Sequence, residues 1–559
     1  MNQVQPRFEH IIPDIAQWPV ARISRERKQF VEELNLFVMD RVLKNYEGSL
    51  GDIISKTIYS EQQRIKLNPW KVDPPNEKEY WKNITQELEL IQAREDRVEA
   101  EKELLHKIIN RYSEEIVGHF MPGTFKLSRN ILTSLFKRLF TRYFGRGQWR
   151  WGSQRQLGDR IKVVGDLPLL RKLFQEGVVV VLPTHHSNLD SIMVGYTVDT
   201  KMGLPAFAYG AGLNLYNVEL AAYFMNRLGA YRVDRRKKNP IYLECLKSMS
   251  AYALTKNVNS IFFPGGTRSR SGATETRVKL GLLSSVIEAQ RLHLMTEKKK
   301  KIFIVTLNIG YHFVLEGASL IDQYLRETGR EKYQRSRNLH PGFSDYLRFV
   351  KNLFVKESEV YMSLGQIMDV FGNSVNENGE SVDKFGHKVQ IDDYFLTDGI
   401  LKADTQRESI YTRILGEAVV SEFQKNNVAL SSNVVSFVAF QLLYEKSECS
   451  DLITFLIAAP QQFSIVAADF ESCCYELIGE LRKMEAEGLI RCSQEFNMSD
   501  PEIVKSGLQQ LGVYHQHRVV ARINEAVYSE DLRLLYFYHN RLSTYPLQQR
   551  LSWVKTFEV

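Results

Sequence analysis

Residues 178–183 of this 559-residue chain read VVVVLP, and they constrain the fold more than any other stretch. Four consecutive β-branched residues predict a strand that is buried on both faces, which is typical of a parallel sheet covered by helices. Pro183 ends the run, small polar residues follow, and an apolar helical pattern resumes at Ile192. The stretch therefore predicts a strand, a polar loop and a helix in an α/β protein.

The polar loop carries His185 and Asp190 in a His-x4-Asp arrangement. In α/β proteins, ligands bind beyond the carboxyl ends of the strands, which is where this loop is expected. A carboxylate that folds back onto one imidazole nitrogen leaves the other nitrogen facing a substrate, as in a general base. The pair alone is weak evidence, because an Asp at this position also caps helices.

The chain divides into four regions of different texture. Short β-branched runs alternate with helical segments between about residues 150 and 370, which predicts a mixed, largely parallel sheet flanked by helices in a region that we place at 121–370. Residues 1–120 are helical and charged, with an amphipathic helix or helical hairpin at 87–116. Turn residues at 371–400 predict an irregular or hairpin insertion, and residues 401–559 predict a helical C-terminal domain.

Residues 127–146 combine apolar residues at helical spacing, among them Phe136 and Phe140, with an excess of arginine and lysine. This pattern is typical of a helix that lies in a membrane interface. A core helix with a basic solvent face has the same pattern, so both interpretations stay open. No window approaches the roughly 18 to 20 apolar residues of a spanning helix, and residues 1–20 lack a signal-peptide pattern. We therefore expect any membrane contact to be peripheral.

Charge and cysteine content narrow the class of protein only slightly. The net charge of +7 suits a nucleic acid, an anionic membrane surface or a phosphorylated metabolite, without choosing among them. The five cysteines are irregularly placed, with neither zinc-site spacing nor an evident disulfide framework. A reducing compartment is the simplest interpretation, and no metal site is predicted.

Three further stretches carry candidate binding residues. In residues 228–236, Gly229 ends a helical segment and an arginine cluster that includes Arg235 follows. Arginine is suited to bidentate recognition of phosphate, although a solvated basic turn would look the same. In residues 262–272, an apolar strand enters a glycine-rich loop with Arg268 and Arg270, where backbone amides and arginines together suit an anion. Residues 304–312 predict a strand that leaves Gly310 at its tip.

Together, in this order and spacing, the four stretches resemble the four sequence blocks of the glycerophosphate acyltransferase family, which acylates glycerol 3-phosphate or dihydroxyacetone phosphate. His185 and Asp190 correspond to the first block, and Gly229 to Arg235 to the second. The third block is matched by Gly266, Thr267, Arg268, Ser269 and Arg270, and the fourth by residues 308–311. The resemblance covers roughly residues 180–315. The surrounding helices fit the branch that acts on glycerol 3-phosphate.

The resemblance implies direct acyl transfer. His185, oriented by Asp190, would take the proton of the 1-hydroxyl of glycerol 3-phosphate as it attacks the thioester of acyl-CoA or acyl carrier protein. Lysophosphatidate for phospholipid synthesis would result. The phosphate would be held by Arg235, Arg268, Arg270 and Lys279, with loop support from Gly229, Gly266, Thr267, Ser269 and Gly310. The resemblance calls for no metal, cofactor or nucleic acid, and it favours peripheral attachment of the 127–146 helix to an anionic membrane at its cytoplasmic face.

One position departs from the family pattern. The third block usually has a glutamate where this chain has Gly265, which puts in doubt whatever that carboxylate does elsewhere. Two alternatives therefore stay open: acylation of dihydroxyacetone phosphate, and a catalytically silent protein that binds lipid or an acyl carrier. A serine nucleophile is not expected, because no GxSxG elbow surrounds Ser187, and His186 is expected to flank the base.

Overall fold

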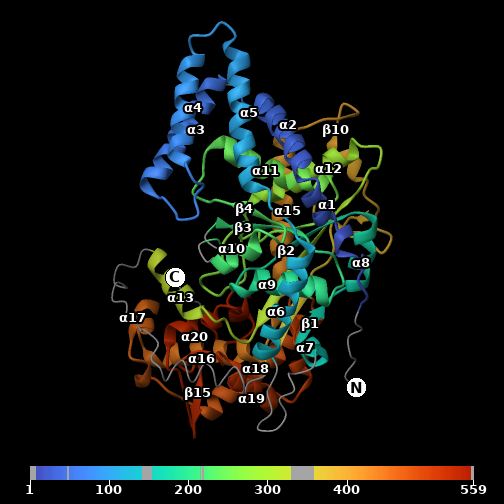
Figure 1. Cartoon of the computed structure of the whole chain (residues 1–559). Coiled ribbons are helices and arrows are strands. Elements are labelled where there is room, and N and C mark those ends of the chain that lie inside the picture. Colours follow the sequence, from blue (N-terminus) through green and yellow to red (C-terminus); the bar gives the residue numbers. More distant parts are fainter. Residues whose placement is uncertain are drawn as a thin grey trace.

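A computed structural model describes residues 8–46, 49–140, 154–213, 216, 219–328 and 358–555 (Figure 1). At its centre lies a seven-stranded sheet in the order β1-β7-β6-β2-β5-β3-β4. The strands are β1 (Ile161–Val164), β2 (Val178–Pro183), β3 (Ala208–Gly212), β4 (Ala230–Val233), β5 (Ser260–Ile261), β6 (Ile302–Tyr311) and β7 (Val360–Leu364). Only β6 and β7 pair in antiparallel register, so the expected mixed, largely parallel sheet is confirmed.

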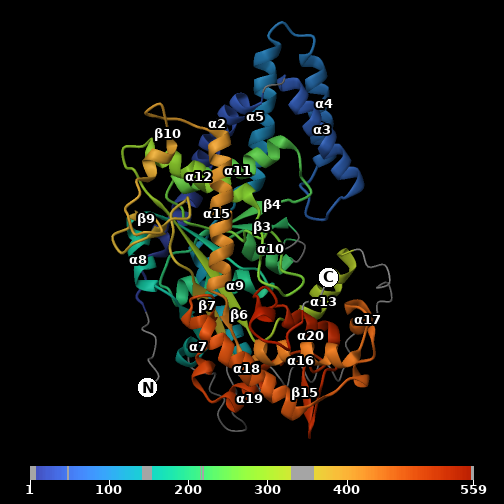
Figure 2. The ribbon, with the colours of Figure 1, turned by 180° about the vertical axis from the view of Figure 1, so that it is seen from behind.

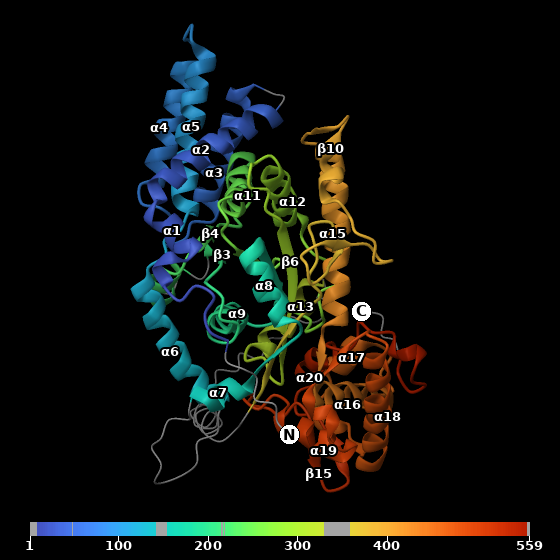
Figure 3. The same ribbon diagram turned by 90° about the vertical axis from the view of Figure 1, so that its right-hand side faces the viewer.

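Strand β2 is central because both of its faces are apolar. Val179 and Val181 belong to a cluster with helices α6 (Pro122–Phe140), α8 (Leu167–Glu176) and α9 (Leu189–Thr200). Val178 and Val180 belong to a second cluster, with helices α11 (Pro240–Thr255), α12 (Leu280–Leu294) and α15 (Thr405–Lys425). In Figure 3, α9 and α15 lie on opposite sides of β6. The run of valines therefore reflects a strand with a helical layer on each face.

The N-terminal helices begin beside the sheet and extend to the top of Figure 1. They are α1 (Pro19–Arg25), α2 (Arg27–Asn45), α3 (Leu50–Leu67), α4 (Glu77–Ile91) and α5 (Arg97–Ile116). The segment expected as one helix or a hairpin is a hairpin, since α4 ends at Ile91 and α5 begins at Arg97. Apolar side chains of these helices share a cluster with α11 and thereby join the group to the sheet domain.

A separate apolar cluster, formed by C-terminal residues, holds the C-terminal helices together below the sheet (Figure 2). Its helices are α13 (Gly317–Glu327), α16 (Ser431–Ser447), α17 (Leu452–Ile457), α18 (Ala467–Ala486), α19 (Asp500–Gln510) and α20 (Leu532–His539). Helix α15 packs on the sheet instead, while α13 packs on α20. The domain boundary expected at residue 401 stays a prediction, and α15, just after it, packs its apolar face on the sheet layer.

Short strands complete the architecture. Within 371–400, β8 (Ser374–Val375) pairs with β9 (Ser381–Val382), and β10 (Leu396–Thr397) pairs with β11 (Ile400–Leu401). In the C-terminal region, β12 (Val428–Ala429) pairs with β14 (Arg491–Cys492). A three-stranded sheet there contains β13 (Ile465–Val466), β15 (Ala521–Ile523) and β16 (Ala526–Tyr528).

Helix α6 corrects one expectation. Phe136 and Phe140 are fully buried in the cluster on the α9 side of the sheet, so they do not face a membrane. The exposed apolar residues of α6 are Leu127, Ile131 and Leu135, at 49%, 48% and 45% exposure. Residues 141–146 of the expected helix lie outside the described residues. Throughout the described ranges, no helix is both long and apolar enough to cross a bilayer.

Candidate active site

His185 and Asp190 meet in the loop between β2 and α9. His185 Nδ1 lies 2.9 Å from Asp190 Oδ2. The same oxygen accepts hydrogen bonds from the amides of His186 at 2.5 Å and Ser187 at 2.8 Å. The hydroxyl of Tyr311, at the end of β6, donates to Asp190 Oδ1 at 2.8 Å. Asp190 is fully buried, so its carboxylate is held in one orientation by donors that the fold supplies.

The imidazole of His185 is the part of this pair that a substrate can reach. Its side chain is 19% exposed, and its ring lies 4.2 Å from that of Phe263, between centroids. Nδ1 faces Asp190, whereas Nε2 has no hydrogen-bond partner among the described residues. The arrangement is that of an oriented general base.

His186 points into the protein rather than toward a substrate. Its side chain is 4% exposed, and Arg541, which follows α20, donates a hydrogen bond to Nε2. Burial, together with the positive charge of Arg541, lowers the pKa of His186 well below its ordinary value. Arg541 also donates to the carbonyl of Ile309 at 2.8 Å. No sequence motif marks Arg541, which lies 355 residues from its histidine partner.

Ser187 supports the loop. Its hydroxyl donates to Glu316 at 3.2 Å and accepts from the amide of Leu189 at 3.2 Å. It is buried, and among the described residues its hydrogen bonds join it to neither histidine ring. The geometry therefore gives no support to a serine nucleophile.

A second carboxylate that sequence reasoning missed holds the main chain of the base. Glu275 Oε1 accepts the amide of His185 at 2.7 Å. On the other side of the residue, the amide of Ser269 donates to the carbonyl of His185 at 2.6 Å. Burial raises the pKa of Glu275 to about 7. The residue lies after the third block, outside every motif.

The third block forms a tight loop around this contact. Gly266 has φ +75°, and a Cβ there would lie 2.6 Å from Cδ of Lys279, so only glycine fits. The hydroxyl of Ser269 donates to the carbonyl of Ala273 at 2.7 Å and closes the turn. Thr267 lies between them and is half-buried. The loop thus brings Lys279 against the glycine-rich backbone.

The four residues expected to bind phosphate differ in whether they form an ion pair with a carboxylate. Arg268 lies 3.2 Å from Glu316, and Arg270 pairs with Glu327 on α13. Arg235 and Lys279 have no ion-pair partner in the described part of the chain. Desolvation and the nearby charge of Arg270 lower the pKa of Arg235. Arg235, near a second cation and without an ion-pair partner in the described residues, is suited to binding an anion.

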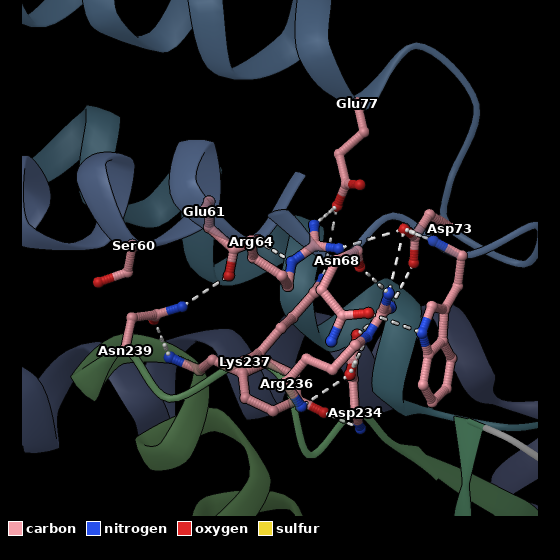
Figure 4. A network of polar contacts seen from close by, with 12 residues as sticks. Ser60, Glu61, Arg64, Asn68, Asp73, Glu77, Asp234, Arg236, Lys237 and Asn239 are labelled. Atoms are coloured by element: carbon pink, nitrogen blue, oxygen red, sulfur yellow. Dashed lines mark hydrogen bonds and ion pairs between the residues drawn. The ribbon is translucent and has the colours of Figure 1, made fainter. Parts of the chain in front are cut away.

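The second block is anchored by a polar network beneath the N-terminal helices (Figure 4). Arg236 pairs with Asp73 and lies 2.7 Å from Asp234, while Lys237 lies 2.5 Å from Glu115. The side chains of Arg236 and Lys237 are only 7% and 2% exposed, so they support the second block from within the protein. Arg235, between Asp234 and Arg236 in the chain, is left for the site.

The glycine before β4 is required by the backbone. Gly229 has φ +83°, and a Cβ there would lie 2.7 Å from Val20. Only glycine tolerates both restrictions at the turn that leads into the second block. Its expected role in supporting that turn stays a prediction.

Gly310 is the second-to-last residue of β6 and lies opposite Tyr361 of β7. A Cβ there would make ordinary contacts of 3.5 Å or more. Its expected role in supporting the loop stays a prediction. The fourth block contacts the first through the amide of Ile309, which donates to the hydroxyl of Thr184 at 3.1 Å.

An apolar cavity of about 250 Å³ lies beside His185. Phe263, in contact with the histidine ring, lines it together with Ile192, Val194 and Gly195 of α9. Ile131 and Leu132 of α6 close another side. The cavity is suited to a hydrocarbon chain. Separately, among the described residues, no three His, Cys, Asp or Glu side chains are grouped so as to hold a metal ion.

Comparisons with known proteins agree with this geometry. Residues 160–310 match the family described as Acyltransferase. A glycerol-3-phosphate acyltransferase of Aeromonas hydrophila subsp. hydrophila is 26% identical over 268 residues, which cover 47% of this chain and 30% of the relative. A probable mitochondrial glycerol-3-phosphate acyltransferase of Caenorhabditis elegans is 31% identical over 176 residues, which cover 30% of this chain and 23% of the relative. Dihydroxyacetone phosphate acyltransferase of Homo sapiens is 29% identical over 154 residues, which cover 26% of this chain and 21% of the relative.

The matched segment therefore spans less than a third of the length of each of these relatives. The family match at residues 160–310 contains β1 to β5, β6 up to Gly310, the paired His185 and Asp190, and the third-block loop. Residues 160–310 therefore form a domain that matches the Acyltransferase family, and part of the chain is similar to enzymes named glycerol-3-phosphate acyltransferase and dihydroxyacetone phosphate acyltransferase.

Proposed function

We propose that this protein transfers a fatty acyl group from acyl-CoA or acyl carrier protein to the 1-hydroxyl of glycerol 3-phosphate, giving lysophosphatidate. The observation that carries the proposal is the surroundings of His185. Arg268 and Arg270 flank Ser269, whose amide donates to the carbonyl of His185, while Phe263, which contacts the His185 ring, lines the apolar cavity. A phosphorylated alcohol and an acyl chain need these two environments. The printed names of the relatives support the same acceptor.

The reaction follows from the free nitrogen of His185. As the substrate hydroxyl attacks the thioester carbonyl, Nε2 takes the hydroxyl proton, and Asp190 stabilises the imidazolium that forms. Collapse of the tetrahedral intermediate breaks the carbon–sulfur bond, and the proton passes to the departing thiolate. The base is thereby restored and the ester is formed.

The acceptor phosphate would bind between the unpaired and the paired cations. Arg235 and Lys279 are ready to receive it, whereas Arg268 and Arg270 would exchange Glu316 and Glu327 for phosphate oxygens. The bound phosphate fixes the position of the hydroxyl, which converts binding energy into orientation at the base.

Dihydroxyacetone phosphate is a second candidate acceptor, because a relative named for it matches part of the same domain. It offers the same phosphate and a primary hydroxyl. A silent binding protein is less well supported, because the pair of His185 and Asp190 has the geometry of a base and not of a structural contact.

We also place the reaction at the cytoplasmic face of an anionic membrane. Leu127, Ile131 and Leu135 form an exposed apolar stripe on α6, and the neighbouring Arg138 is exposed. Ile131 of this stripe lines the cavity beside the base. A stripe with this composition is suited to the interface of an anionic bilayer, where the acyl product would remain.

The test is acyl transfer from radiolabelled palmitoyl-CoA and palmitoyl carrier protein to glycerol 3-phosphate and to dihydroxyacetone phosphate. His185→Ala should abolish product formation while the protein stays folded, because the base is removed. His387→Ala is the matched control, since that histidine is highly exposed on the β9–β10 connection. An inactive natural protein with both donors and both acceptors, or an active His185→Ala variant, would reject the proposal.

A further inference from the structure

Glu275 makes a contact that no other described side chain makes with the base. Its Oε1 accepts the main-chain amide of His185, and its side chain is 8% exposed. Its second oxygen is buried and has no hydrogen-bond partner within the described ranges. The residue comes from the segment between the third-block loop and α12, 90 residues from the histidine in sequence.

The amide of His185 needs such a partner because the strand has already ended. The last backbone ladder contact before it is made by Thr184, whose amide donates to Leu307 at 3.0 Å. Beyond that point, the part-buried amide of His185 would be left without an acceptor, which destabilises the native loop. Glu275 supplies the acceptor, and Ser269 holds the carbonyl of the same residue. The main chain of the base is therefore fixed on both sides.

The carboxylate of Glu275 lies close to Gly265, the position where the sequence departs from the family pattern. A Cβ at residue 265 would lie 3.3 Å from Glu275 Cγ and 3.6 Å from Glu275 Oε1. Residue 265 does not have a positive φ, so a side chain there meets no backbone strain. A glutamate at 265 would extend into the space that the Glu275 carboxylate fills. The two positions are thus alternative sources of one carboxylate.

Neighbouring charges make this place suitable for a carboxylate. Arg541 stabilises the negative charge of Glu275, whereas Asp190 opposes it. His186 Nε2 lies 3.9 Å from the free Oε2. The side chain of Glu275 is therefore enclosed by the C-terminal arginine and the first block, and it faces the backbone of the base.

We propose that Glu275 is the positioning residue that fixes the main chain of His185, in the place for which the family uses a glutamate at position 265. The inference rests on the proposed acyl transfer for its kinetic consequence. The contact between Glu275 and the amide of His185 does not depend on the reaction and can be tested without a substrate. Glu275 then compensates for the missing glutamate at position 265, so Gly265 does not indicate lost activity.

The test compares four variants of the full chain with the natural protein. Glu275→Ala removes the acceptor, and Glu275→Met removes it while filling most of the volume. Glu275→Ala with Gly265→Glu returns a carboxylate from the other position. Glu275→Ala with Gly265→Ala is the matched control, because it adds a Cβ at residue 265 without a carboxylate.

Two measurements are made on each variant. Site-resolved hydrogen exchange follows the amide of His185 and needs no substrate. Steady-state acyl transfer gives kcat and the KM of the phosphorylated acceptor. Glu275→Ala and Glu275→Met should each lose about tenfold or more in amide protection and in kcat, with little change in KM. The Gly265→Glu double variant should regain most of both losses, and the Gly265→Ala double variant should regain neither.

The two measurements distinguish a wrong inference about Glu275 from a wrong proposed function. An inactive natural protein rejects acyl transfer, and the exchange measurement still decides whether Glu275 holds the amide. Unchanged protection in both single variants overturns the inference, whatever the activity. Equal recovery by the two double variants also overturns it, because a carboxylate at 265 would then be irrelevant. Should the alanine variant fold poorly, Glu275→Met decides the result by itself.

Discussion

Four hydrogen bonds converge on the carboxylate of Asp190 from an imidazole, two amides and a phenol. The carboxylate cannot rotate without breaking several of them, so the ring of His185 is oriented before a substrate arrives. The opposite face of the same loop is held by Glu275. His185, the proposed base, is thus held in place through both its ring and its main chain.

At Arg268, substitution by Ala should raise the KM of the phosphorylated acceptor by about tenfold or more and leave that of the acyl donor nearly unchanged. The reason is that a guanidinium contributes a charge-assisted contact to phosphate and none to the acyl chain. Steady-state kinetics with each substrate varied in turn measures the effect. Arg277→Ala is the control, because Arg277 is an exposed arginine of the same segment. Equal increases in both KM values would remove Arg268 from the phosphate site.

The raised pKa of Glu275 makes stability depend on pH in a defined direction. Burial raises the pKa from 4.5 to about 7, although the positive charge of Arg541 acts in the opposite sense. Between these values the folded state binds a proton that the unfolded state has lost, so this group destabilises the fold as pH rises. Glu275→Gln cannot ionise and should escape the effect.

Urea-induced unfolding at pH 5 and pH 8 would show this difference. The free energy of unfolding of Glu275→Gln, relative to the natural protein, should rise by about 2–3 kcal/mol between the two pH values. Asp190 and His186 also lie near Glu275 and are present in both proteins, so the comparison isolates the carboxyl group of Glu275. A difference that is constant or falls with pH would contradict the prediction.

The residues that could be predicted from sequence lie close to one another in the chain. His185 and Asp190 share one loop, and a local pattern reveals them. Glu275 lies 90 residues from its contact and Arg541 lies 355 residues from its contact, so only the folded chain brings them together. Neither has a motif, because each acts through a single buried contact.

At the level of elements, α6 shows why an apolar pattern can be assigned to the wrong face. Apolar residues occur on more than one side of this helix, and the sequence does not say which side packs. Phe136 and Phe140 pack against the layer that contains Tyr196, whereas Leu127, Ile131 and Leu135 stay exposed. The β2 pattern was unambiguous in contrast, because every residue of that strand is buried.

Replacing the stripe residues Leu127, Ile131 and Leu135 together by Ser should weaken sedimentation with anionic liposomes by about tenfold or more. The reason is that the substitution removes the apolar area available for the interface and leaves the core intact. The control is the replacement by Ser of Leu67, Leu90 and Val98, which are exposed at the N-terminal hairpins. Equal binding by both triple variants would reject α6 as the membrane contact.

Helix α9 offers a direct test of the cavity. Gly195 lines it, and a Cβ there would meet nothing within 4 Å. Gly195→Leu should fill part of the space and shift the preferred acyl donor toward shorter chains, by about tenfold in relative kcat/KM. Competition between palmitoyl and decanoyl donors measures the shift. Gly281→Leu on α12 is the control, since that helical glycine also has open space and lies outside the cavity lining. An unchanged preference would place the acyl chain elsewhere.

Over the whole molecule, three parts of the chain meet at one site. The N-terminal helices anchor the second block through Arg236 and Asp73, and the sheet domain provides the base. The C-terminal region provides Arg541. The alternation of strands and helices predicted the central sheet, because that pattern is local. The position of α15 could not be predicted, since an amphipathic helix fits equally well against the sheet or against its C-terminal neighbours.

Arg541→Leu should lower both activity and stability. It removes the donor to His186 and leaves the buried carboxylate of Glu275 without its nearby positive charge, a loss of about 3 kcal/mol or more. The kcat should fall by about tenfold or more, because the first block loses its support. Urea-induced unfolding and steady-state kinetics measure the two effects.

Arg550→Leu is the control for this prediction. Arg550 also lies in the C-terminal region and pairs with Glu480 and Glu487 near the surface. Its loss should change activity little, because surface ion pairs contribute little to stability. Full activity in a folded Arg541→Leu variant would show that the C-terminal region does not support the base.

The insertion of Arg541 beside His186 also has a consequence for protein synthesis. The ribosome makes the two residues far apart in time, with 355 positions between them. A nascent chain that has folded its central sheet still lacks the guanidinium, so His186 has no donor from Arg541 and the buried carboxylate of Glu275 lacks this positive charge. Under the proposed function, the site would therefore be completed only after the C-terminal region has been made.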